Sequence, residues 1–235
     1  MENKFKKHLV ENLGLEIAEN QLKQFVLYFD FLIEYNQSVN LTSITEKEEV
    51  FYKHFYDSLT IVKSVDLNQI KSLCDLGAGA GFPSIPIKII YPHLDIFIID
   101  SLGKRITFLK KLTSILSLSN VQLFNDRIEK HASKHREQYD LVTARALGKL
   151  PLIMELGFPL LKVGGQFIAY KSNQFEKELY DSTNALKLLH GTILKTDHFS
   201  LPNHLGERTL IVIEKTRKTN ILYPRKFSDI KKRSL

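Results

Sequence analysis

The residues whose spacing best predicts chemistry are three alternate glycines and an aspartate that follows them. Gly77, Gly79 and Gly81 come directly after the short apolar run 71–76. Because glycine has no Cβ and tolerates positive φ, such a turn lets the backbone approach a ligand closely. Asp100 ends a second apolar run, 23 positions after Gly77, close to the ~20-residue spacing at which an acidic residue binds ribose hydroxyls. Together these residues predict a nucleoside ligand.

The residue after the third glycine argues against a pyrophosphate ligand. A dinucleotide fingerprint, G-x-G-x-x-G, has its last glycine where this chain has Phe82. An apolar side chain at that corner suits a ligand without a pyrophosphate, whose adenine or ribose lies across the turn. The turn therefore favours another class of protein over a nucleotide-dependent oxidoreductase.

Other reactive residues do not predict a second chemistry. His54, Asp57 and Ser58 could suggest a hydrolase, but three groups so close on one helix radiate from its axis, and no oxyanion donors accompany them. The one cysteine, Cys74, lies inside the first apolar run and is expected to be a buried thiol. We expect no disulfide and no metal site.

Length and composition favour one main domain with an appendage. The chain has 235 residues, of which 43% are hydrophobic and 25% charged, as in soluble globular proteins. The N-terminus has no apolar stretch typical of a signal peptide, and no run is long enough to span a bilayer. We expect a cytoplasmic protein with no membrane partner and, by default, a monomer.

The positive charge is concentrated at the C-terminus. The charged residues of the stretch 215–235 are Lys215, Arg217, Lys218, Arg225, Lys226, Lys231, Lys232 and Arg233 against Asp229. Eight basic residues minus one acidic residue give +7, which equals the net charge of the whole chain. Tyr223 and Phe227 alternate with these charges and offer stacking surfaces. The tail is typical of a polyanion-binding segment, most plausibly for nucleic acid, and a solvated disordered end is the alternative.

Helical and strand patterns alternate along the chain. The expected strands are residues 71–76, 95–100, 121–124, 139–144, 165–171, 192–199 and 208–215. Residues 1–65 are expected to be helical, with one helix beginning at a capping box formed by Thr45 and Glu48. No helical pattern separates the last two strands, so they are expected to pair antiparallel. The pattern predicts an α/β protein with a doubly wound, mostly parallel seven-stranded sheet, helices on both faces and an N-terminal helical extension.

In such a sheet the ligand lies at the carboxyl ends of the central strands. The residues at those ends are Gly77 to Phe82, Asp100, Asp126 to Glu129, Arg145 and Lys171. We expect an adenine to lie between apolar side chains such as Phe82 and Ile128, with a polar group near Asp126 or Glu129.

Motifs along most of the chain resemble one protein family. They are Asn40-Leu41-Thr42, His54-x-x-Asp57-Ser58, Asp75 to Pro86, Asp100-Ser101-Leu102-Gly103-Lys104-Arg105, Arg127-Ile128-Glu129, Arg145-Ala146 and Ala169-Tyr170-Lys171. With them the chain resembles the Rossmann-like class I S-adenosylmethionine-dependent methyltransferases and, more closely, the RsmG (GidB) family. That family methylates N7 of a guanosine in bacterial small-subunit (16S) ribosomal RNA. The chain departs from the pattern at Ser172, where many members have glycine, and in the tail after Phe227.

The resemblance implies S-adenosylmethionine as the cofactor, and ribosomal RNA or the assembled small subunit as the partner. The expected cofactor-binding residues are Gly77, Gly79, Phe82, Asp100, Ile128, Glu129 and Arg145. Candidates for positioning are His54, Asp57, Arg145 and Lys171, and candidates for RNA binding are Lys104, Arg105, Arg127, Lys171, Arg225 and Lys226. The expected organisation is a helical subdomain over 1–65, a methyltransferase domain over 66–215 and a basic tail over 216–235.

Methylation of guanine N7 needs no catalytic base, because N7 carries a free lone pair and no proton. The enzyme would act by alignment and electrostatics. Methylation of an exocyclic amine uses an Asn/Asp-Pro-Pro-aromatic segment in related enzymes, and here that segment reads Thr143-Ala144-Arg145-Ala146. Attack through pyrimidine C5 needs a cysteine, and Cys74 is misplaced for it. The alternatives are a non-catalytic RNA-binding module and a methyltransferase for another RNA or a small molecule.

Overall fold

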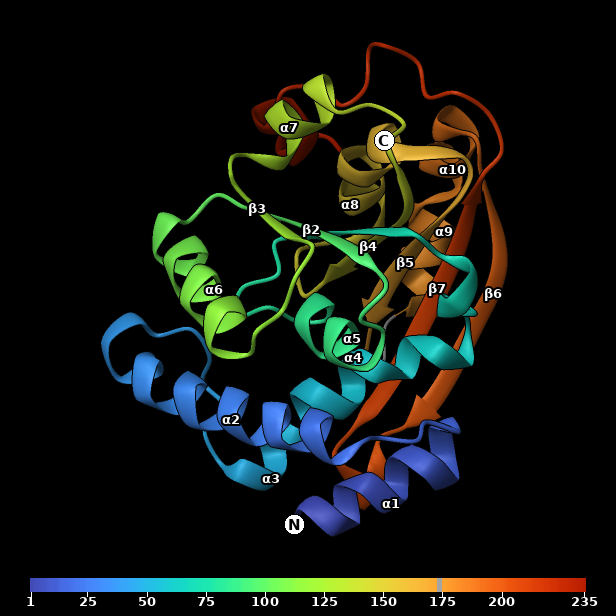
Figure 1. Ribbon diagram of the computed structural model, residues 1–235. Coiled ribbons are helices and arrows are strands. Elements are labelled where there is room, and N and C mark those ends of the chain that lie inside the picture. Colours follow the sequence, from blue (N-terminus) through green and yellow to red (C-terminus); the bar gives the residue numbers. More distant parts are fainter. Residues whose placement is uncertain (173–174) are drawn as a thin grey trace.

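A seven-stranded sheet organises the molecule in the computed structural model, which describes residues 1–172 and 175–235 (Figure 1). The strands are β1 (Ser72–Leu76), β2 (Asp95–Asp100), β3 (Val121–Asn125), β4 (Tyr139–Arg145), β5 (Leu161–Lys171), β6 (Gly191–Ser200) and β7 (Glu207–Lys215). Their order across the sheet is β3-β2-β1-β4-β5-β7-β6. The first five strands pair in parallel, and β7 pairs antiparallel with both β5 and β6. The predicted fold class and the antiparallel terminal hairpin are confirmed.

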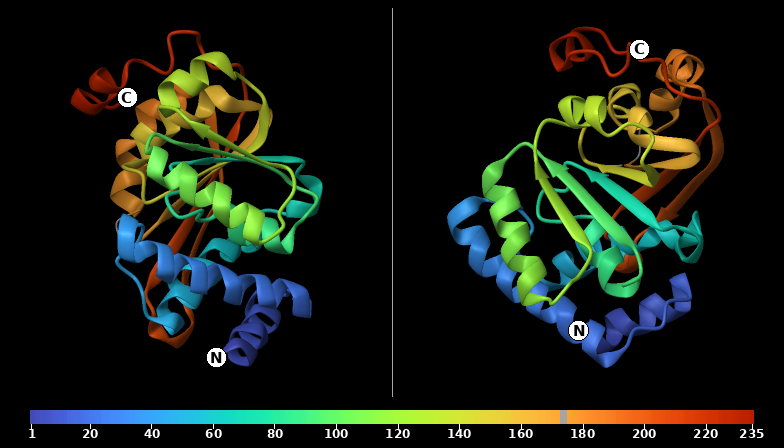
Figure 2. Two further views of the ribbon diagram at one scale, coloured as in Figure 1. Left: turned by 60° about the vertical axis from the view of Figure 1, so that its left-hand side comes forward. Right: turned by 45° about the horizontal axis from the view of Figure 1, so that its top comes forward.

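Helices cover both faces of the sheet (Figures 1 and 2). They are α1 (Glu2–Leu13), α2 (Glu19–Val39), α3 (Lys47–Val50), a π-helical segment (Phe51–Tyr56), α4 (Asp57–Leu59), α5 (Ser84–Ile90), α6 (Gly103–Ile115), α7 (Ile128–Lys134), α8 (Leu150–Gly157), α9 (Phe175–Asp181), α10 (Thr183–Leu189) and α11 (Phe227–Lys232). Short 3₁₀ turns occupy Thr60–Lys63, Leu67–Gln69, Phe158–Leu160 and Pro202–His204. No helix in the described ranges is long and apolar enough to span a membrane.

The central strands are buried on both faces, as is usual for parallel strands between helical layers. In β1, Leu73 packs into one hydrophobic core, whereas Cys74 and Leu76 pack into a second core on the opposite face. Cys74 is fully buried, and burial raises the pKa of its thiol well above the ordinary value. The expected buried thiol is thus confirmed.

The N-terminal helices share the first core with the sheet. Phe5 of α1 packs edge to face against Phe25 of α2 and Phe51, and these rings belong to the same buried cluster as Ile96 of β2. Helix α2 also contacts α5 and α6, and Figure 2 shows it running along them. The N-terminal helices therefore form one packed body with the sheet.

Two local predictions are wrong at their boundaries. The Thr45 capping box does not form: α3 begins at Lys47, its N-cap is Glu46, and no side chain caps it. The helix continues as a π-helical segment, in which His54 Nδ1 lies 3.3 Å from Nη2 of Arg145 at the end of β4. Strand β5 begins at Leu161 rather than 165. Its first residues include Gly164 at φ +81°, and the β4–β5 register shifts nearby, so the early part does not show a strand's regular pattern.

Candidate cofactor and substrate site

The glycine turn after β1 is packed tightly against neighbouring elements. Gly77, Gly79 and Gly81 all have positive φ, and Gly77 N donates to Ile99 O at 2.8 Å. A Cβ on Gly77 would lie 2.8 Å from Leu147 Cδ1, whereas a Cβ on Gly79 would meet no atom within 4 Å. Gly79 therefore leaves space open for a ligand, as close approach to the backbone requires.

Asp75 supports the same turn from beneath. It is fully buried in β1, where Oδ2 accepts from Ser84 N at 3.1 Å and Oδ1 from the Thr143 hydroxyl at 3.3 Å. Burial raises the pKa of Asp75 to about 7, against the lowering effect of these hydrogen bonds. The carboxyl thus joins the start of α5 to β4 and is closed to a ligand.

Asp100 ends β2 beside the turn and is 2% exposed. Its Oδ2 accepts from Gly79 N at 3.3 Å and Arg105 Nη1 at 3.2 Å, and its Oδ1 accepts from Leu102 N at 2.9 Å. A carboxylate has about four acceptor positions, so one stays available for a hydroxyl. This arrangement fits the ribose of a nucleoside.

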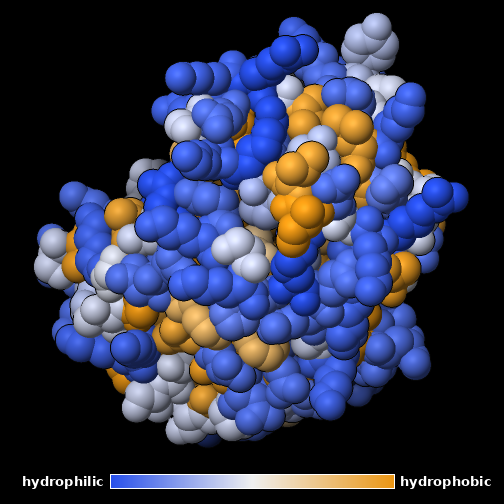
Figure 3. Space-filling model, turned by 90° about the horizontal axis from the view of Figure 1, so that it is seen from above, coloured by the Kyte–Doolittle hydropathy of each residue, from blue (hydrophilic) through white to orange (hydrophobic). Residues whose placement is uncertain are grey.

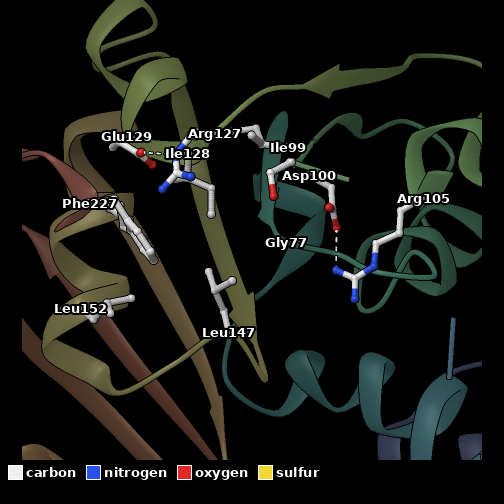
Figure 4. Close-up of a pocket in the computed structure, with 12 residues that line it drawn as sticks. Gly77, Ile99, Asp100, Arg105, Arg127, Ile128, Glu129, Leu147, Leu152 and Phe227 are labelled. Carbon is white, nitrogen blue, oxygen red and sulfur yellow. Dashed lines mark hydrogen bonds and ion pairs between the residues drawn. The ribbon is translucent and has the colours of Figure 1, made fainter. Parts of the chain in front are cut away.

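The first pocket, a cavity of about 220 Å³, opens beside Asp100 (Figure 4). Ile128, Leu147, Leu152 and Phe227 provide its apolar side, and Figure 4 shows Asp100 on the opposite side. Apolar side chains facing a carboxylate with a free acceptor position match the chemistry of an adenine and its ribose. The residues present therefore fit the nucleoside part of S-adenosylmethionine.

A second pocket of about 250 Å³ continues from the first. The two share Gly77, Arg105 and Leu147, and the second is further lined by His54 and Arg145. Phe82 and Gly79 also line the second pocket. The two cavities therefore form one groove along the ends of β1, β2 and β4.

Phe82 and Ile128, the two side chains expected to flank the adenine, line different parts of the groove. Phe82 lines the second pocket and Ile128 the first. The Phe82 ring is 8% exposed because it packs between other rings, with Tyr28 at 5.5 Å and His54 at 4.4 Å between centroids. Phe82 is thus mostly occupied by the N-terminal helices, a contact that no local pattern predicts.

Arg145 ends β4 and is held in place by the segment around His54. Its Nη2 lies 2.9 Å from Asp57 Oδ2 and also donates to Lys53 O. Asp57 is 1% exposed, and its Oδ1 lies 3.1 Å from Arg208 Nε. A single buried carboxylate therefore fixes two guanidinium groups, Arg145 from β4 and Arg208 from β7.

His54 is held neutral beside Arg145. Its Nδ1 lies 3.3 Å from Arg145 Nη2, and its Nε2 lies 3.0 Å from Thr42 Oγ1. Because Arg145 can only donate, Nδ1 accepts and the ring proton sits on Nε2. Burial, aided by the charge of Arg145, lowers the pKa of His54 to about 3. Both ring nitrogens are occupied and the ring carries no charge.

A third pocket adjoins the second through Arg145 and Ala146. It is also lined by Asp57, Lys171 and Arg208. Lys171 Nζ lies 2.6 Å from Glu178 Oε2 and donates to Gly148 O at 2.7 Å. Three cationic side chains, Arg145, Lys171 and Arg208, are paired with two carboxylates, Asp57 and Glu178, so this end of the groove keeps one net positive charge.

The expected RNA-binding residues lie in different surroundings. Arg105 lines the first two pockets, Lys171 lines the third, and Lys104 donates to Val39 O. Arg127 pairs with Glu129, and Lys226 is exposed. Arg225, however, forms a two-pronged ion pair with the fully buried Glu155, at 2.8 and 2.6 Å.

The charge of the tail is thus partly used inside the protein. Lys215 is fully buried, lies 3.2 Å from Glu137 Oε1 and donates to the carbonyls of Phe158 and Leu161. Together with Arg225 it removes two of the eight basic residues counted above from the set that could meet a polyanion freely. No group of three or more potential metal ligands gathers within residues 1–172 and 175–235.

Sequence reasoning missed several residues that line the groove: Leu147, Leu152, Arg208 and Phe227. Leu147 follows Arg145 by two positions and could have been found from the end of β4. Arg208 reaches the site only because β7 pairs with β5, and Phe227 arrives from the tail. Arg208 has no local sequence signal, and the pattern around Phe227 predicted a stacking surface for nucleic acid rather than a place in this groove.

The fold and the site together define a class I S-adenosylmethionine-dependent methyltransferase. The defining features are the strand order of the sheet, the antiparallel β7, the glycine turn after β1 and the acidic residue that ends β2. The fold is shared with a variant of the 16S rRNA adenine-N1 methyltransferase from Catenulisporales acidiphilia, with a TM-score of 0.53 and 13% identity over 64% of this chain and 87% of that one. The family model described as rRNA small subunit methyltransferase G (GidB) matches residues 21–210, and this chain belongs to that family.

Two relatives support the assignment along nearly the whole chain. The ribosomal RNA small subunit methyltransferase G of Macrococcus caseolyticus is 48% identical over 96% of this chain and 94% of its own. The Bacillus subtilis protein of the same name is 48% identical over 91% of this chain and 90% of its own. The resemblance found in the sequence motifs is thereby confirmed.

Proposed function

We propose that this protein transfers the methyl group of S-adenosylmethionine to N7 of a guanosine in small-subunit ribosomal RNA. One observation carries the proposal: in a member of this family, a continuous groove leads from an adenosine-sized pocket, past the glycine turn, to a positively charged pocket. The groove can hold a nucleoside cofactor at one end and an RNA nucleotide at the other.

The cofactor would lie along the first two pockets. Asp100 would accept from a ribose hydroxyl and the apolar side with Ile128 would contact the adenine, next to Glu129 at the start of α7. The methionine part would pass over Gly77 and Gly79 toward Arg145. When bound, the cofactor supplies an electrophilic methyl group, and the chain's task is to hold an acceptor in line with it at about 3–3.5 Å.

The chemistry of the second pocket favours an acceptor without a proton to lose. No carboxylate lines this pocket within the described part of the chain, and its imidazole, His54, is neutral with both nitrogens engaged. A general base needs a free acceptor within hydrogen-bond reach. Guanine N7 needs none, because its lone pair attacks directly.

The positive third pocket supports an RNA acceptor. Lys171 and Arg208 would meet the phosphates around the target nucleotide, since Lys and Arg make most contacts to the nucleic-acid backbone. Arg145, fixed by Asp57, would set the position of either the base or the cofactor. Because ribosomal RNA is the proposed substrate, alone or in the assembled subunit, the enzyme would act in the cytoplasm, and we propose that it acts as a monomer.

Transfer of labelled methyl groups tests this function. Small ribosomal subunits that lack the modification are incubated with the protein and labelled S-adenosylmethionine, and the RNA is digested to nucleosides. We expect the label in 7-methylguanosine. Asp100→Asn should raise the KM for S-adenosylmethionine about tenfold or more, because it removes a buried charged acceptor. Asp95→Asn, at the opposite end of the same strand and outside the pockets, is the matched control.

Label in another nucleoside would keep the cofactor site and overturn the N7 assignment. The alternative, an RNA-binding module without catalysis, requires that the protein not bind the cofactor. Calorimetric titration with S-adenosylmethionine distinguishes the two, since the enzyme must release or absorb heat on binding and the module must not.

A further inference from the structure

We propose that the C-terminal segment, residues 216–235, is part of the cofactor site, with Phe227 forming the wall against which the adenine packs. This rests on the proposed function, because it takes the first pocket as the nucleoside site. The segment lies beyond the residues that the family model matches, 21–210. It contributes Phe227 to a pocket whose other walls come from the ends of β1, β2 and β4 and from α6, α7 and α8.

The position of Phe227 is set by its neighbours. Figure 4 shows its ring beside Ile128 and Arg127, facing the space enclosed with Leu147 and Leu152. The Arg127 guanidinium lies over the ring, 4.9 Å from its centroid, and is itself paired with Glu129. An aromatic face held in this way offers a flat apolar surface to a purine, and base–aromatic stacking is sequence-tolerant and strong.

Three contacts hold the segment to the body of the protein: the ion pair of Arg225, the hydrogen bonds from Arg136 and the burial of Ile230. Glu155 of α8 is 0% exposed, and Arg225 meets it with Nε, Nη2 and its backbone N. Arg136 donates to Thr219 O at 2.7 Å and Tyr223 O at 2.6 Å.

Beyond Phe227, Ile230 is fully buried. An ion pair that neutralises a buried carboxylate with two-pronged geometry is costly to break. The segment is therefore built to stay on the body.

This placement changes the role expected for the tail. The face on which the segment runs is mainly hydrophilic, with a few hydrophobic side chains among the polar ones (Figure 3). Ile221 and Leu222 are 78% and 71% exposed, so the segment does not bury every apolar side chain. It buries Ile230 and presents Phe227 to the pocket. Arg225 serves as an anchor, and the tail's part in RNA binding is left to residues such as Lys226.

Binding measurements test the wall directly, with S-adenosylhomocysteine and 5′-methylthioadenosine as ligands. Both contain adenosine, but only the first carries the amino-acid part. Phe227→Ala should weaken both about tenfold, within the range of one stacking contact. Phe227→Leu, which keeps apolar bulk without the flat ring, should show a smaller loss, and Ile221→Ala on the same segment should bind like the unchanged protein. Hydrogen exchange of residues 223–232 should slow when either ligand binds.

The outcomes separate this inference from the proposed function. Asp100→Asn is measured in parallel with the same ligands. If Asp100→Asn weakens binding while Phe227→Ala and Phe227→Leu bind normally, the proposed contact of Phe227 with the adenine is refuted. The proposed cofactor site is then retained. If neither position affects binding, the nucleoside does not occupy this pocket, and both the role of Phe227 and the proposed cofactor position fail, whereas the methyl transfer is judged by the labelled product. A loss for S-adenosylhomocysteine but not for methylthioadenosine would contradict contact with the adenine end.

Discussion

Asp57 is the residue on which the charge balance of the site depends. It is buried, and both of its oxygens face guanidinium groups, those of Arg145 and Arg208. A carboxylate in this position has a structural and a positioning role at once, because removing it leaves two cations close together without compensation.

We predict that Asp57→Asn lowers kcat about tenfold or more, since Arg145 loses the partner that fixes it. The affinity for S-adenosylhomocysteine should change much less, because Asp57 lines the third pocket and not the first. Unfolding should be easier by about 3 kcal/mol, as for a broken buried ion pair. Steady-state kinetics and urea denaturation measure these effects. Glu207→Gln, which loses an exposed carboxylate paired with His198, is the control, and equal effects of both variants would refute the role.

The buried His54 makes stability depend on pH in a predictable direction. Its native pKa of about 3 lies below the ordinary value of 6.5, so the unfolded chain binds a proton that the native state does not. The free energy of unfolding is therefore not reduced by His54 above pH 6.5, and it decreases as the pH falls from 6.5 toward 3.

Between pH 7.5 and pH 5 the free energy of unfolding should fall by about 2 kcal/mol more in the unchanged protein than in the His54→Asn variant. Urea denaturation at several pH values measures the difference between the two proteins. Because Asp75 and His131 titrate in both, their contributions cancel in this comparison. Parallel pH profiles would show that His54 is not held neutral.

At the scale of elements, the glycine turn depends on contacts from outside the sheet. The Tyr28 hydroxyl of α2 donates to Ala80 O within the turn. A Cβ on Gly81 would lie 2.8 Å from that hydroxyl and 2.7 Å from Ile85 Cγ1. Helix α2 therefore shapes the glycine turn, although the two lie far apart in sequence.

Two matched substitutions separate packing from ligand access. Gly81→Ala should lower stability by about 2–3 kcal/mol, because a steric clash adds to the strain of positive φ. Gly79→Ala should cost about 1 kcal/mol for its φ alone but should weaken S-adenosylhomocysteine binding, since Gly79 lines the second pocket. Urea denaturation and calorimetry measure the pair. A reversed order of stabilities would contradict the packing described for the turn.

At the scale of the whole molecule, the helices over 1–65 and the sheet share a buried core. We predict a single unfolding transition for the full chain, because separating the N-terminal helices would expose Phe5, Phe25 and Phe51. Near-ultraviolet circular dichroism reports these aromatic rings, and far-ultraviolet circular dichroism reports the backbone. Coincident thermal curves are expected, and an earlier near-ultraviolet transition would show that the subdomain unfolds on its own.

The strand pattern and the ends of strands were predictable because they depend on local periodicity. Gly77, Asp100 and Ile128 could be assigned to one site by the rule that ligands lie at the carboxyl ends of strands. The environment of Phe82 could not, because it depends on how α2 and the π-helical segment pack over the turn. Arg225 looked like a free charge because Glu155, its partner, is 70 positions away. Long-range packing thus decided what sequence patterns left open.

The central claim is that the methyl group goes to guanine N7 without a base, and a modified substrate tests it most directly. Small-subunit ribosomal RNA is prepared with 7-deazaguanosine in place of guanosine, assembled into subunits, and incubated with the protein and labelled S-adenosylmethionine. The substitution removes the nucleophilic nitrogen and leaves the exocyclic amine and the carbonyl oxygen. We predict methylation of guanosine-containing subunits and none of the 7-deaza subunits, although both bind the protein. Comparable labelling of the two would show that another atom accepts the methyl group.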